Sequence, residues 1–100
     1  MHQPISKEEM RSRIARNLRE LRLARGLSQE QLAAKAEVHR TFVGQVENEA
    51  KVPSIDSLVM LANALGVDPS TITSRKLPAS RKRGLTSVLE PPKETTQDEG

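Results

Sequence analysis

The chain has 100 residues, of which 35% are hydrophobic and one, Phe42, is aromatic, and it carries a formal net charge of +3 at pH 7. This length allows one domain with a small aliphatic core, and the absence of cysteine excludes disulfides and thiolate metal sites. No stretch approaches the roughly 18 consecutive apolar residues of a membrane span, and the N-terminus lacks the apolar segment of a signal peptide, so we expect a cytoplasmic protein with no membrane partner.

Capping signals and the spacing of apolar residues predict five helices and no strand. Serine begins three of the helices in an N-cap or capping-box pattern, Asp68-Pro69 begins the last, and Gly26 and Gly66 stop the first and the fourth. Between these signals apolar residues recur at helical intervals. The predicted helices span about 7–25, 29–36, 40–47, 55–65 and 69–73. The fold class is therefore all-α.

Composition divides the chain into three parts. In chain order they are a flexible N-terminus, a folded domain and a mostly disordered tail, at residues 1–5, 6–73 and 74–100. The tail is basic from Arg75 to Arg83 and acidic from Glu90 onward, and it has too few large apolar residues for a core of its own. Within it, residues 84–89 are the segment that we expect to become ordered against a partner.

The second and third predicted helices carry apolar stripes that can face each other. Leu32, Ala33 and Ala36 form the stripe on the second helix, and Val43 and Val46 form the stripe on the third. The small side chain of Ala33 would let the two backbones approach closely where they cross. Two short helices with this register and a tight turn are typical of a DNA-binding helix-turn-helix.

An ordered set of motifs makes the chain resemble the lambda repressor/Cro-type, or Xre-like, helix-turn-helix family over about residues 10–73. The motifs are Leu21-Arg22, Gly26-Leu27-Ser28-Gln29, Leu32-Ala33, Val46-Glu47 and Leu61-Ala62-Asn63-Ala64-Leu65-Gly66-Val67. Within this family, residues 39–47 look most like the restriction–modification controller proteins. The resemblance implies a compact five-helix lambda repressor-like fold and a bacterial or phage transcription regulator, associated with the nucleoid, whose partner is double-stranded operator DNA.

The chain departs from the family at two turns. Glu37 follows the second predicted helix and Glu49 follows the third, and the family usually has glycine at both positions. Both positions commonly need a left-handed backbone. We therefore expect each glutamate to adopt that conformation at a cost of roughly 1 kcal/mol.

The resemblance makes residues 40–47 the recognition helix. If the valine stripe faces inward, Arg40, Thr41, Gly44 and Gln45 face outward to the bases of the major groove. Arg40 would bind guanine O6 and N7, Gln45 would bind adenine N6 and N7, and Thr41 would contact a thymine methyl or a phosphate. Gly44 would let the helix sit close to the DNA.

A second set of residues is expected to contact the DNA backbone: Gln29, His39, Asn48 and Lys51. Arg16, Arg19 and the basic cluster of the tail would add electrostatic attraction. An ordinary solvated surface is the alternative interpretation for the outward residues, and a plain turn residue is the alternative for His39. For Arg22 and Glu47, in contrast, the resemblance implies a structural ion pair between the first and third helices, so no DNA contact is expected from them.

One such module places a single short helix in a groove, so we expect a homodimer on a roughly palindromic operator with half-sites about 34 Å apart. The region around the last two helices carries more apolar residues than a small monomer needs to bury. These residues are Ile55, Val59, Ile72 and Leu77. They are the candidates for the dimer interface.

The alternative function is an antitoxin, which would use the same fold to bind DNA and the segment 77–89 to bind a toxin. The transcription machinery is another candidate partner. No nucleophile–base pair, carboxylate dyad or glycine-rich phosphate loop occurs at usable spacing, so we do not expect an enzyme. The two histidines, His2 and His39, are isolated, so neither a metal nor another cofactor is expected.

Overall fold

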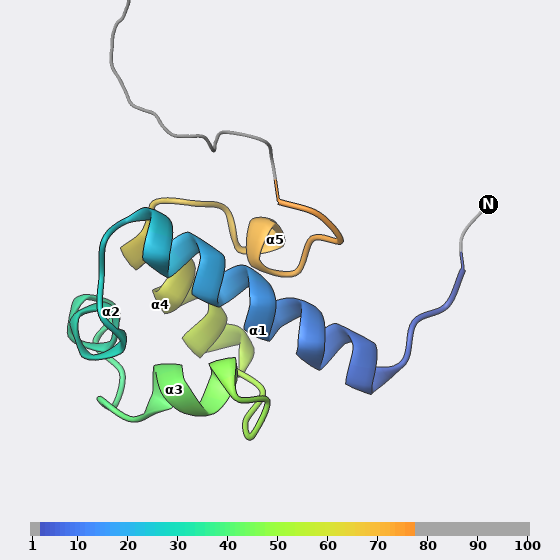
Figure 1. Cartoon of the computed structure of the whole chain (residues 1–100), viewed down its shortest axis with the longest axis horizontal. Coiled ribbons are helices and arrows are strands. Elements are labelled where there is room, and N and C mark those ends of the chain that lie inside the picture. The colour runs from blue at the N-terminus through green and yellow to red at the C-terminus, as the bar shows by residue number, and fades with distance from the viewer. Residues whose placement is uncertain (1–2, 78–100) are drawn as a thin grey trace, which may run out of the picture.

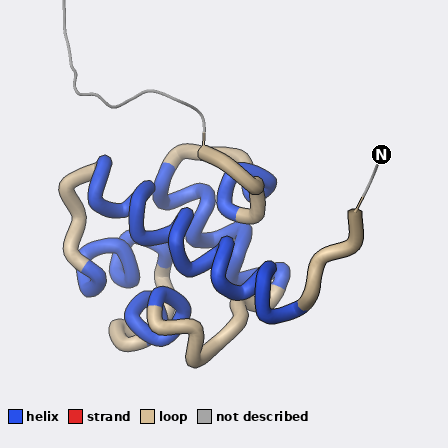
Figure 2. Tube along the Cα trace, turned by 45° about the vertical axis from the view of Figure 1, so that its right-hand side comes forward, coloured by secondary structure: helices blue, strands red, loops and turns tan. Residues whose placement is uncertain are grey.

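The computed structural model describes residues 3–77 of the chain. These residues form helices joined by short loops and contain no strand (Figure 2). The helices are α1 (Lys7–Ala24), α2 (Gln29–Ala36), α3 (Phe42–Glu47), α4 (Ile55–Leu65) and α5 (Pro69–Ile72). The predicted all-α class with five helices is confirmed, and four of the five helices begin at the predicted residue.

The helix starts follow from side-chain caps. Ser6, Ser28 and Ser54 each accept a hydrogen bond from the backbone N–H three residues later, and Asp68 accepts one from the N–H of Ser70. At Ser28 the box is reciprocal, because the side chain of Gln31 accepts the N–H of Ser28 at 2.8 Å. These bonds satisfy N–H groups that have no partner within the helix, and they determine where each helix begins.

Two helix ends rest on non-glycine residues in the left-handed conformation. Glu37 has φ 60° at the end of α2, and Glu49 has φ 64° after α3. The expectation of a left-handed backbone at both positions is confirmed. At the end of α2, the N–H of Val38 bonds to the carbonyl of Ala33 at 3.0 Å, so the chain reverses within two residues.

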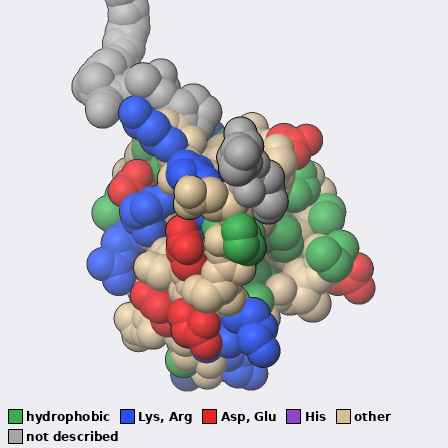
Figure 3. All heavy atoms as spheres, turned by 90° about the vertical axis from the view of Figure 1, so that its right-hand side faces the viewer, with side chains coloured by type: hydrophobic (Ala, Val, Ile, Leu, Met, Phe, Trp, Pro, Cys, Tyr) green, Lys and Arg blue, Asp and Glu red, His purple; other side chains and the backbone are tan. Residues whose placement is uncertain are grey.

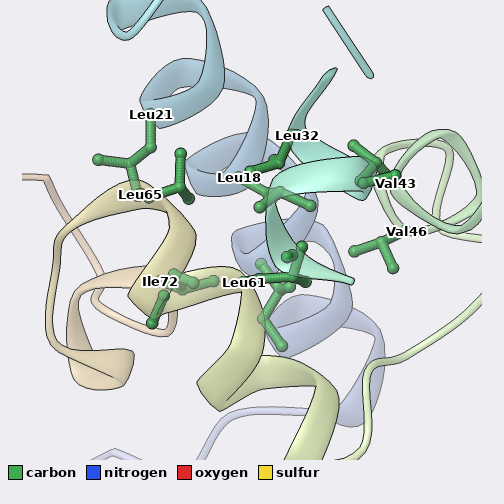
Figure 4. Packing of buried hydrophobic residues seen from close by; sticks show 12 residues of the cluster. Leu18, Leu21, Leu32, Val43, Val46, Leu61, Leu65 and Ile72 are labelled. Atoms are coloured by element: carbon green, nitrogen blue, oxygen red, sulfur yellow. The ribbon is translucent and has the colours of Figure 1, made fainter. Parts of the chain in front are cut away.

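The helices enclose one small core around α1. α3 lies along one side of α1 and α5 along the other, while α4 packs against both α2 and α5 (Figure 1). Figure 4 shows large apolar side chains from all five helices pointing toward one another. The fully buried ones are Leu18, Leu32, Leu61, Leu65, Ile72, Val43 and Val46. Ile72 is therefore not available to a partner, and its candidacy for a dimer interface is wrong because the monomer core already buries it.

Asn17 on α1 is hydrogen-bonded to the backbone at the end of α5 and just after it. Its buried side-chain Nδ2 donates to the carbonyl of Ile72 at 2.8 Å and to that of Ser74 at 2.7 Å. Beside it, Nη2 of Arg16 donates to the carbonyl of Arg75 at 2.8 Å. Because a single amide and a guanidinium satisfy these carbonyls, residues 74–75 lie against α1.

The remaining predictions for the tail, including most of its basic cluster and the segment 84–89, lie outside the described residues. Within residues 3–77, no helix combines the length and apolar character that crossing a bilayer requires.

Candidate nucleic-acid interface

The turn between α2 and α3 is organised by His39. Its backbone carbonyl accepts the N–H of Phe42 at 2.9 Å, and its ring Nδ1 accepts the N–H of Thr41 at 3.2 Å. Thr41 makes no side-chain cap to the helix. The imidazole therefore takes the place of a cap for this turn, and α3 begins at Phe42.

The recognition helix is shorter than predicted. Arg40 and Thr41 are predicted in its first turn, whereas both lie in the turn before α3, where Nδ1 of His39 accepts the N–H of Thr41. Both side chains are exposed, while Gly44 and Gln45 on the helix are half-buried. All four residues lie within one short stretch of chain, with Arg40 and Thr41 in the turn before α3 and Gly44 and Gln45 on the helix itself.

The inward face of α3 joins the core and carries one buried charge. Val43 and Val46 are fully buried against the α2 stripe, so the facing arrangement expected from the sequence is present. Glu47, one residue further on, is also buried. A carboxylate in this position requires partners, because burial of an unpaired charge is costly.

Arg22 on α1 supplies two of those partners. Its Nε lies 2.7 Å from Oε2 of Glu47, and its Nη2 lies 3.1 Å from Oε1. Its remaining nitrogen, Nη1, donates to the carbonyl of Leu27 at 2.8 Å. The guanidinium thus connects α1 with α3 and with the loop that leads into α2.

Gln29 and Arg19 complete the shell around Glu47. The side-chain Nε2 of Gln29 donates to Oε1 of Glu47 at 3.0 Å, and Nε of Arg19 lies 3.5 Å from the same oxygen. Burial raises the pKa of Glu47, but hydrogen bonds from Arg22 and Gln29 and the charges of Arg22 and Arg19 outweigh it. The pKa is held below its usual value of 4.5. Glu47 is therefore ionised at neutral pH.

The other residues expected at the DNA backbone flank α3. His39, Asn48 and Lys51 are exposed, and Asn48 and Lys51 follow the last residue of the helix. Arg16 is different, because its guanidinium is hydrogen-bonded to the carbonyl of Arg75 on the α5 side of α1. Sequence reasoning missed the internal role of Gln29, for which the only signal was its position just after the Ser28 cap.

Within residues 3–77, no three His, Cys, Asp or Glu side chains are grouped so that they could hold a metal ion. The chemistry that the region offers is hydrogen bonding and positive charge. Exposed hydrogen-bond donors flank the short helix α3, whose inward face packs against α1 and α2.

Two helices crossing at a tight turn, with the second backed by a buried ion pair, define a helix-turn-helix module. Residues 18–72 match the family described as Helix-turn-helix. The chain belongs to this Xre-like helix-turn-helix family, a class of DNA-binding proteins that regulate transcription.

Named relatives and solved structures agree with this assignment. The chain is 36% identical over 63 residues to the Control protein C.SmaI of Serratia marcescens. The matched region covers 63% of this chain and 75% of that protein. Its fold is similar to that of the restriction–modification controller protein C.AhdI from Aeromonas hydrophila, with a TM-score of 0.60 and 39% identity over 62% of this chain and 94% of the other. It is also similar to the hypothetical transcription factor NHTF from Neisseria, with a TM-score of 0.65 and 28% identity over 74% of this chain and 85% of the other. These relatives are named as regulators, not as enzymes.

Proposed function

We propose that the protein is a sequence-specific transcription regulator that binds a roughly palindromic operator as a homodimer. The single observation that carries the proposal is the exposure of Arg40 and Thr41 at the start of α3, with the opposite face of that helix buried against α1 and α2. A helix backed in this way can enter a major groove without losing its packing.

In this proposal the residues divide into two roles. Arg40 reads a guanine through its two-pronged guanidinium, Gln45 reads an adenine, and Thr41 lies against the base edges. The backbone contacts come from Gln29, His39, Asn48 and Lys51, which set the position of the protein without reading sequence. Nδ1 of His39 is taken up by the N–H and the hydroxyl of Thr41, so Nε2 is the ring nitrogen that is left for a phosphate.

The homodimer is supported by apolar side chains that the monomer leaves exposed. Ile55 is 76% exposed and Val59 is 39% exposed, and they lie one turn apart on α4. Figure 3 shows hydrophobic side chains gathered toward one edge of the face that it views. A six-residue recognition helix buries too little surface for tight binding by one copy, so a second copy over α4 is the natural solution.

DNA-binding specificity tests the proposal. Sites are selected from random double-stranded DNA, and the affinities for the selected duplex and a scrambled one are measured by fluorescence anisotropy at one salt concentration. Arg40→Ala should reduce the preference for the selected duplex by about ten-fold, since one bidentate base contact supplies that much discrimination. Lys51→Ala should weaken binding to both duplexes alike.

Lys35→Ala is the matched control, because Lys35 is exposed on α2 but borders α4 instead of α3. Both affinities should stay nearly unchanged. A wild-type protein with no preference for any sequence, or a preference that Arg40→Ala leaves intact, would overturn the proposal.

Sedimentation tests the dimer separately. Ile55→Glu and Val59→Glu should each convert a dimer into a monomer and weaken operator binding, while scrambled-DNA binding falls less. A wild-type protein that is monomeric both free and on the operator would contradict the dimer. A regulator of this kind acts on DNA in the cytoplasm, and the relatives named above favour this role over that of an antitoxin.

A further inference from the structure

The amide of Gln29 lies across α3, between Glu47 and Gly44. Its Nε2 is 3.0 Å from Oε1 of Glu47. A Cβ atom added to Gly44 would lie 3.1 Å from Oε1, 3.5 Å from Cδ and 3.6 Å from Nε2 of Gln29. The whole amide head group therefore lies over the backbone of Gly44, which is one turn before Glu47 on the same face of the helix.

The orientation of this amide is determined by charge. An ionised carboxylate only accepts hydrogen bonds, so the NH2 group of Gln29, and not its oxygen, must face Glu47. The carboxylate in turn is held by two bonds from Arg22. Among residues 3–77, the NH2 group makes this one hydrogen bond, and its second hydrogen is left for another acceptor.

We propose that Gly44 and Glu47 are positioning residues for Gln29: Glu47 orients the amide and Gly44 leaves the space for it, so that the second N–H donates to a DNA phosphate. The inference rests on the proposed function and assigns Gly44 a different role from the one expected from sequence. Gly44 is needed because of a neighbouring side chain in the same protein, and not because the helix must approach the bases.

This role predicts opposite effects on folding and on binding. Alanine is a better helix former than glycine, and the contact that it would make is with the far end of a flexible side chain that can move aside. Gly44→Ala should therefore keep or raise the melting temperature. The displaced amide would no longer be aligned with the phosphate, so binding should weaken for selected and scrambled DNA alike.

A double-mutant cycle tests the proposal. Affinities for the selected and scrambled duplexes are measured for the wild type, Gly44→Ala, Gln29→Ala and the double variant. Gly44→Ala should weaken binding about five-fold when Gln29 is present and have almost no effect when Gln29 is alanine. An equal loss in both backgrounds would show that Gly44 faces the DNA directly and would overturn the proposal, as would no loss in either.

A measurement on the free protein separates this proposal from the proposed function. The side-chain NH2 signals of Gln29 in a nitrogen-15 NMR spectrum should shift in Gly44→Ala, while those of Gln31, which is bonded to Ser28 instead, should not. Unmoved Gln29 signals would overturn the positioning role even if the protein binds its operator. If the wild type prefers no DNA sequence, the proposed function fails, and the positioning role is then decided by the double-mutant cycle on scrambled DNA and by the spectrum.

Discussion

Arg22 on α1 and Glu47 on α3 face each other in the interior, with Nε 2.7 Å from Oε2 and Nη2 3.1 Å from Oε1. The side chain of Glu47 is fully buried and that of Arg22 nearly so. This two-point pair joins the longest helix to the helix proposed to read DNA. It connects stability and function, because the position of α3 depends on it.

Arg22→Ala should destabilise the protein strongly. Removing one partner of a buried pair leaves the other charge uncompensated, which typically costs about 3–5 kcal/mol. Arg19 is the matched control, since its Nε lies 3.5 Å from the same carboxylate but its side chain is 53% exposed. Arg19→Ala should cost less than about 1 kcal/mol. Urea unfolding followed by circular dichroism measures both, and equal losses would contradict this account.

Acid should unfold the protein partly through Glu47. Its pKa in the folded state is below the usual 4.5, so its contribution to stability is present above that pH and is lost as pH falls through the folded-state pKa. Glu47→Gln should be less stable than the wild type at pH 7, with a smaller further loss between pH 5 and pH 3. Urea midpoints across this range provide the test. If the stability of the two proteins fell in parallel with pH, Glu47 would not be the group responsible for the acid sensitivity.

Glycine should stabilise the two left-handed positions. Glu37→Gly and Glu49→Gly should each raise the free energy of unfolding by about 1 kcal/mol, because glycine adopts a positive φ without strain. Glu20→Gly is the control: it makes the same change at an exposed position within α1 and should lower stability by about 1 kcal/mol. Thermal melts of the three variants suffice. If Glu37→Gly lowered the free energy of unfolding as much as Glu20→Gly, the backbone at Glu37 would not be strained.

Asn17 should be difficult to replace. Asn17→Ala leaves the carbonyls of Ile72 and Ser74 without their buried donor, and we expect a loss of about 1–3 kcal/mol. Asn17→Asp has nearly the same shape but places a carboxylate against those carbonyls. Its free energy of unfolding at pH 7 should therefore be lower than that of Asn17→Ala. Chemical denaturation of the two variants provides the comparison. An aspartate as stable as the asparagine would show that shape alone matters there.

Local signals in the sequence predicted most of the helices. Each serine cap acts within three residues, and a glycine stop acts within one turn, so the starts of α1, α2 and α4 could be read without tertiary information. The start of α3 was placed two residues too early. His39 is not one of the usual capping residues, so the sequence did not indicate that its ring would accept the N–H of Thr41 two residues later or that α3 would begin at Phe42.

Sequence by itself therefore determined the all-α class, the five helices and the facing stripes of α2 and α3, because caps, stops and apolar periodicity act between residues close in the chain. The caps and, through the family resemblance, the Arg22–Glu47 pair were expected from the sequence, whereas tertiary structure alone decided which other polar groups meet. Asn17 contacts residues more than 50 positions away, and Gln29 meets Glu47 across 18. Such pairs depend on how the helices cross and on which buried groups lack partners, and both are properties of the packed molecule.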